Sequence, residues 1–122
     1  MIKRRIGVMV DSFKAATVRE GVLQAKQVGA EGLQIYAVDG EMFPDNLGDS
    51  QRREFKRFVS GEGLEIAALC GDLGGHGFSI REDNPNRIET SKKIMDLAVE
   101  LGTNVVTTHI GVVPEDTSNP KY

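Results

Sequence analysis

The sequence has few of the residues that mark specialised classes of protein. Its 122 residues include no tryptophan, two histidines and one cysteine, Cys70. A single cysteine cannot form an intrachain disulfide, so the class of small secreted domains held together by disulfides is excluded. The absence of tryptophan excludes nothing by itself.

Long apolar runs are also missing. The longest are about five to seven residues, whereas a membrane-spanning helix needs about 20. The segment from Met1 to Arg5 leads into a strand-like stretch that is too short for the core of a signal peptide. We therefore expect a cytoplasmic protein with no membrane partner.

Positive charge is not concentrated anywhere in the chain. The sequence has 15 Lys and Arg against 18 Asp and Glu, a formal net charge of −3. Because phosphate contacts need clustered basic side chains, we expect no nucleic-acid partner. With 39% hydrophobic residues the chain is expected to fold. Its length allows one domain, residues 1–122.

Short apolar runs alternate with stretches of helical periodicity. Each expected strand is rich in apolar or β-branched residues, and a glycine precedes three of the four. The expected strands are 6–10, 32–38, 64–70 and 105–110, and the expected helices are 17–29, 49–61 and 84–102. This order predicts an α/β fold with a parallel sheet built from βα units.

Helix ends have recognisable local signals. Thr17 and Glu20 have the spacing of a capping box, and Asp49 or Ser50 is expected to cap the second helix. Gly102 is expected to end the third helix.

Two architectures fit four parallel strands. A flavodoxin-like domain suits the length, but it normally has a fifth strand and a final helix. A (β/α)₈ barrel explains the repeat better, yet it typically needs about 250 residues. The sequence ends in a polar, proline-containing loop at 111–122 that looks like the approach to a further helix. The residues alone leave both architectures open, and the family resemblance described below favours the barrel, so we expect a (βα)₄ half of a TIM barrel with strand order 1-2-3-4. The chain is then a single partial domain that ends in the loop after strand four.

Candidate site residues follow the carboxyl ends of the strands, where parallel α/β folds bind ligands. Asp11 follows the first strand, and Asp39 and Glu41 follow the second. Cys70 and Asp72 end the third strand, His76 lies in the glycine-rich loop after it, and His109 ends the fourth. Imidazole can act as an acid, a base or a metal ligand. The structural alternatives are a solvated loop for His76, a hydrogen-bonded strand end for His109, turns for the carboxylates and core packing for Cys70.

Two segments resemble a known family. Residues 64–76, LEIAALCGDLGGH, and 105–114, VVTTHIGVVP, look like strands three and four of the xylose isomerase-like TIM barrels. These are sugar phosphate isomerases and epimerases, in a superfamily that also contains endonuclease IV. The resemblance runs along the whole chain but covers only the amino-terminal half of such a barrel.

The resemblance implies an enzyme that moves a proton between adjacent carbons of a sugar or sugar phosphate through an enediolate. It also implies a divalent metal, Mn, Mg, Co or Zn, whose ligands come from strands five to eight. This sequence lacks those strands, so we expect no catalytic residue, no metal bound to this chain alone and no activity of the isolated chain. The residues implied as substrate contacts are Asp11, Cys70, Asp72, His76 and His109.

Two other functions remain open. In the endonuclease IV branch, His76 and His109 would be zinc ligands of a phosphodiesterase, although the acidic composition disfavours DNA binding. A flavodoxin-like binding or assembly module would instead use Asp11 and Asp72 as an acidic pocket. That module has strand order 2-1-3-4, whereas the barrel has order 1-2-3-4.

An open four-stranded sheet with helices on one side leaves its other face uncovered and both edge strands unpaired. Val8, Ile35 and Ile66, or their neighbours, would lie on that inward face. We therefore predict a homo-oligomer or a complex with a complementing carboxy-terminal half. Sedimentation of the purified chain tests the first, and a well-folded monomer at micromolar concentration would contradict it.

Overall fold

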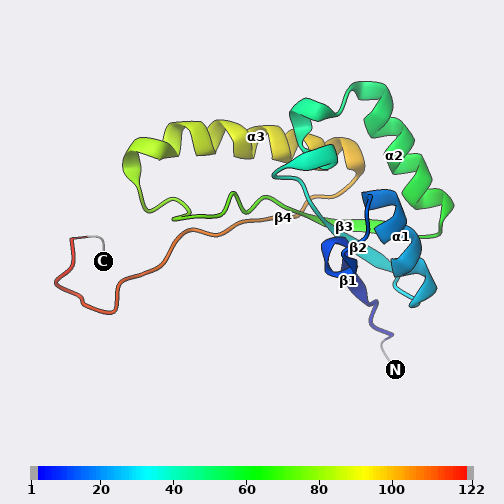
Figure 1. Cartoon of the computed structure of the whole chain (residues 1–122), viewed down its shortest axis with the longest axis horizontal. Helices are drawn as coiled ribbons and strands as arrows, with labels where there is room; N and C mark the ends of the chain where they lie inside the picture. Colours follow the sequence, from blue (N-terminus) through cyan, green and yellow to red (C-terminus); the bar gives the residue numbers. More distant parts are fainter. Residues whose placement is uncertain (1–2, 121–122) are drawn as a thin grey trace.

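The computed structural model describes residues 3–120 and contains one four-stranded parallel sheet (Figure 1). Its strands are β1 (Gly7–Met9), β2 (Gly32–Tyr36), β3 (Glu65–Cys70) and β4 (Val106–Thr107). Neighbours in the sheet follow the order β1-β2-β3-β4, and every pair is parallel. The expected order 1-2-3-4 is confirmed, and the flavodoxin-like order 2-1-3-4 is wrong for this chain.

Three helices connect the strands: α1 (Val18–Gln27), α2 (Asp49–Gly61) and α3 (Asn84–Leu101). All three contribute buried residues to a single core cluster together with β2 and β3, so they cover the same face of the sheet. Figure 1 shows α2 and α3 packed beside each other on that side. No helix within residues 3–120 is long and apolar enough to cross a membrane.

The helix ends follow local chemistry. Thr17 caps α1, because its Oγ1 accepts a hydrogen bond from the Glu20 N–H at 3.2 Å. Gly102 ends α3 in the left-handed conformation, with φ +87°. The expected cap of α2 is wrong: the helix already begins at Asp49, and its N-cap is Gly48.

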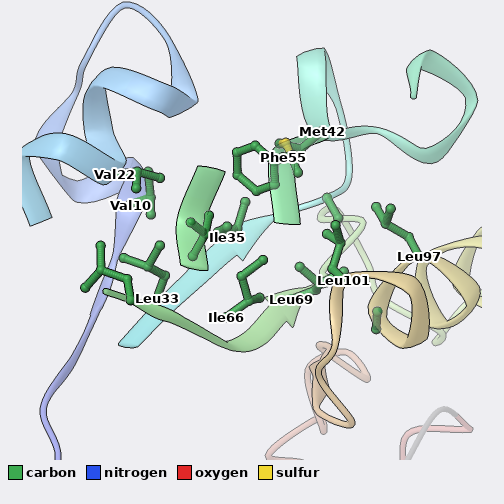
Figure 2. Packing of buried hydrophobic residues seen from close by; sticks show 14 of the residues in the cluster. Val10, Val22, Leu33, Ile35, Met42, Phe55, Ile66, Leu69, Leu97 and Leu101 are labelled. Carbon is green, nitrogen blue, oxygen red and sulfur yellow. The ribbon is translucent and has the colours of Figure 1, made fainter. Parts of the chain in front are cut away.

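The core lies between the sheet and the helices (Figure 2). Leu33, Ile35 and Leu69 are fully buried on the helix side of β2 and β3. Phe55 of α2 and Leu97 of α3 pack above them. Burying one such side chain contributes about 1.5–3 kcal/mol to stability, so this cluster holds the three βα units together.

The other face of the sheet is uncovered and largely polar. Gln34 alternates with Leu33 and Ile35 along β2, so its side chain points away from the helices. Ile35 and Ile66 belong to the core, and Val8, the register partner of Leu33, packs against it. The neighbour Gln34, rather than either isoleucine, therefore lies on the inward face.

Two polar contacts cross this open face, each skipping one strand. Gln34 Nε2 donates to Thr107 Oγ1 of β4 at 2.9 Å, passing over β3. Arg5 Nη1 lies 2.7 Å from Glu65 Oε2, and β2 runs between them. Inward side chains of a TIM barrel form layers from alternate strands, so both contacts match the interior of a half barrel.

β1 is shorter than expected. Val10 was expected in a strand at 6–10, but it begins a 3₁₀-helix, η1 (Val10–Phe13). This turn buries Val10 against Val22 of α1 (Figure 2). α1 can approach because Gly21 has no side chain: a Cβ there would lie 2.6 Å from Val10 Cγ1. Tertiary packing thus ends β1 early.

β4 is also shorter than the expected 105–110. After Thr107 the chain no longer pairs with β3 and packs instead against the loop between β3 and α3. The Phe78 N–H donates to the Ile110 carbonyl at 3.0 Å. Gly77 makes the close approach possible: a Cβ there would lie 2.5 Å from the backbone nitrogen of Gly111. Figure 1 shows the two segments side by side.

We predict that Gly77→Ala destabilises the chain much more than Gly74→Ala. Both glycines have positive φ, +60° and +72°, but no atom lies within 4 Å of the Cβ position at Gly74. Alanine at either site lowers the free energy of unfolding by about 1–2 kcal/mol, because a residue with a Cβ is strained in this conformation. At Gly77 the overlap with the 109–111 backbone adds about 1–3 kcal/mol. Urea unfolding measures the difference, and equal losses would contradict the loop packing.

Candidate functional site

A cavity of about 780 Å³ opens at the carboxyl ends of β1 and β2. This is the edge of the sheet where α/β barrels bind their ligands. Its wall combines the end of β1, the η1 turn, the start of α1, the last residue of β2 and one loop carboxylate. The lining residues are Met9, Val10, Asp11, Ser12, Lys14, Ala15, Ala16, Thr17, Val18, Tyr36 and Glu41.

The η1 turn places two charged residues of the cavity. Asp11 is exposed on the turn, and its carbonyl accepts a hydrogen bond from the Lys14 N–H at 3.1 Å. Lys14 has φ +55° and is the one non-glycine residue with positive φ within residues 3–120. Such a conformation costs on the order of 1–3 kcal/mol and is common at ligand sites. Lys14 was missed from the sequence, because nothing local indicates a left-handed lysine.

Glu41 connects the β2–α2 loop to α1. It lies on the short 3₁₀-helix η2 (Gly40–Met42), and its Oε1 accepts a hydrogen bond from the Val18 N–H at 3.0 Å. A carboxylate at a helix N-terminus is stabilised by the helix dipole. Glu41 therefore closes one side of the cavity and fixes the start of α1.

Tyr36 is the aromatic side chain of the cavity. It ends β2 on the open face, and its register partner on β3 is the buried Cys70. The pKa of the Tyr36 phenol is raised, first by its electrostatic interaction with the Cys70 side chain and then by desolvation and by Asp11; Asp72 adds a smaller effect. The phenol therefore stays protonated at neutral pH. The alternation of β2 could have indicated Tyr36, since it follows Ile35 at a strand end.

The remaining sequence-predicted residues lie in the β3–α3 loop and after β4. Asp72 is half-buried, and its Oδ1 accepts a hydrogen bond from the Gly74 N–H at 2.8 Å, which is a turn-forming role. His76 Nε2 lies 2.9 Å from Asp83 Oδ2. His109 is exposed beyond the end of β4.

The two histidines are brought near each other through their backbones, because residues 76–77 pack against residues 109–111. Neither lines the cavity. Asp11 lines the cavity. Cys70 and Asp72 do not line it, but both raise the pKa of Tyr36, which does. Substrate contact by the histidines stays a prediction.

No three His, Cys, Asp or Glu side chains within residues 3–120 lie close enough to hold a metal ion. The ligands of the metal that the resemblance implies would come from strands five to eight, so that metal stays a prediction. A zinc site at His76 and His109 also stays a prediction.

Four parallel strands joined by three helices, with a cavity at the carboxyl ends of the strands, define half of an α/β barrel. Residues 22–121 match the family described as xylose isomerase-like TIM barrel, and the chain belongs to that family. No curated protein matches the sequence.

Several solved structures share the fold. A xylose isomerase domain protein from Planctomyces limnophilus aligns over 96% of this chain with a TM-score of 0.70 and 21% identity. A sugar phosphate isomerase/epimerase from Parabacteroides distasonis aligns over 93%, with a TM-score of 0.61 and 19% identity. The third, described as the probable 3-DHS dehydratase AsbF from Bacillus anthracis, aligns over 86%, with a TM-score of 0.66 and 20% identity.

The chain spans less than half of each of these structures: 44%, 41% and 38% of their chains, respectively. Identities this low support the fold alone. Their names include an isomerase/epimerase and a probable dehydratase, and one fold can serve different reactions.

We predict that Cys70→Ala lowers the pKa of the Tyr36 phenol, because the Cys70 side chain is the largest cause of its rise. The other tyrosine, Tyr122, is replaced by Phe so that absorbance at alkaline pH reports Tyr36 alone. Asp72→Asn should produce a smaller decrease, and Asp96→Asn, exposed on α3, should produce none. An unchanged titration in Cys70→Ala would contradict the contact.

Proposed function

We propose that this chain supplies the substrate-binding part of a sugar isomerase or epimerase site. The observation that carries the proposal is the cavity at the carboxyl ends of β1 and β2, lined by Asp11, Lys14, Tyr36 and Glu41. The family membership supports the same reading, because barrels of this kind bind ligands at this end of the sheet.

The cavity carries the groups that recognise a sugar. Carboxylates accept hydrogen bonds from hydroxyl groups, an ammonium donates to them, and a protonated phenol does both. Tyr36 supplies the phenol from a strand end, where its position is held by the sheet. Lys14 supplies the ammonium from the strained turn. Together they could orient a polyhydroxylated chain across the open face.

The reaction in this proposal is transfer of a proton between adjacent sugar carbons through an enediolate. This chain would bind and orient the sugar, whereas the groups that hold a divalent metal and move the proton would come from a complementing carboxy-terminal half with strands five to eight. We propose accordingly that the chain alone is inactive. A cytoplasmic setting is part of the proposal, since the single thiol, Cys70, is free and buried.

Titration of a ketohexose such as D-fructose into the isotope-labelled chain tests the proposal by NMR. We expect amide shifts at Lys14 and Tyr36 and in α1 near Val18, and no isomerised product. Tyr36→Phe and Lys14→Met should each weaken binding about fivefold or more, the loss expected for one hydrogen bond.

Asp96→Asn on the exposed side of α3 is the control and should bind as the parent does. Absence of binding by any of a set of aldoses and ketoses would overturn the proposed function. Turnover by the isolated chain would overturn the proposed inactivity.

A further inference from the structure

The charge of the cavity distinguishes two classes of sugar substrate. Two carboxylates, Asp11 and Glu41, face one ammonium, Lys14, so the lining has a net charge of −1 at neutral pH. Within residues 3–120, Lys14 is the one basic side chain of the lining. A phosphate ester brings close to two negative charges, which such a lining repels.

Two basic side chains on the neighbouring helices have partners of their own and do not line the cavity. Arg19 of α1 stacks on the Phe58 ring, with its Cζ 4.7 Å from the ring centroid. Arg87 of α3 donates from Nη1 to the Gly74 carbonyl at 3.0 Å. Neither arginine adds a positive charge to the lining.

The start of α1 is also unsuited to a phosphate. Free N–H groups at a helix N-terminus are a common phosphate site. Here Glu41 Oε1 accepts from the Val18 N–H at 3.0 Å, and Thr17 Oγ1 accepts from the Glu20 N–H at 3.2 Å. Just before the helix, Glu20 Oε2 accepts from the Ala16 N–H at 3.2 Å. The protein's own oxygens occupy these donors.

The environment of Tyr36 agrees with this charge inventory. The pKa of its phenol is raised first by Cys70 and then by desolvation, and the carboxylates of Asp11 and Asp72 add to the rise, so negative charge lies close to this side chain. The hydrogen-bonding groups that remain match hydroxyls.

We infer that the substrate portion held in this cavity is an uncharged sugar rather than a sugar phosphate. This inference rests on the proposed function and specifies the substrate class of the same site. Sugar hydroxyls would donate to Asp11 and Glu41 and accept from Lys14.

The test compares D-fructose with D-fructose 6-phosphate and D-fructose 1-phosphate, each titrated into the labelled full chain by NMR. We expect the free sugar to bind about tenfold more tightly than either ester, the ratio that results when the two charges of a phosphate lie about 6 Å from one net negative charge in water. Inorganic phosphate should leave the Lys14, Thr17 and Val18 amides unshifted.

A charge-neutralised variant, Asp11→Asn with Glu41→Gln, should reduce this ratio to about two or below. Both replacements keep an amide oxygen as acceptor, so the Glu41 contact with α1 can persist. Asp96→Asn removes a charge on α3 outside the cavity and should leave the ratio unchanged.

Tighter or equal binding of either ester, or a ratio that the double variant does not change, would overturn this inference and leave the proposed function standing. Absence of binding by all three sugars and by further neutral sugars would overturn the proposed function, and this inference with it.

Discussion

The alternation of side chains along β2 is the constraint on which the rest of the structure depends. Leu33 and Ile35 are completely buried against the helices, so Gln34 and Tyr36 must face the other way. A shift of one residue would expose both apolar side chains and bury the polar ones, which fixes the register strongly. The core and the cavity are therefore two consequences of a single strand pattern.

The open face uses small residues to let polar side chains reach across a strand. Ala68 lies beside Gln34 in the register, and the Gln34 amide passes over β3 to Thr107. Gly32 of β2 pairs with Gly7 of β1 and with Glu65 of β3, and it has no side chain to obstruct the contact between Arg5 and Glu65. These contacts join alternate strands, as in the interior layers of a closed barrel. The face that lacks a covering layer is thus already organised as a barrel interior.

Family membership and site chemistry answer different questions. The match over residues 22–121 shows the fold and the family, whereas the structural neighbours carry names of different reactions. The net charge of the cavity lining, set by Asp11, Glu41 and Lys14, is a property of this chain and not of the fold. It is a stronger guide to the substrate than the fold, because parallel barrels with the same topology bind unrelated ligands through their loops.

The sequence by itself determined the order of strands and helices and the caps at Thr17 and Gly102, because these follow from local periodicity and local hydrogen bonds. The half-barrel topology, which the structure confirms, was indicated by the family resemblance and not by local pattern alone. The sequence also indicated Asp11 correctly as a residue of the carboxyl edge. Only the tertiary structure decided where β1 and β4 end. Val10 packs against α1, and the 109–111 backbone bonds to the β3–α3 loop, and both partners are distant in sequence. The same holds for Lys14, Tyr36 and Glu41, which meet in one cavity only after α1 packs against η1. Local pattern sets which face of an element is buried, but convergence of side chains from separate elements is a property of the packed chain.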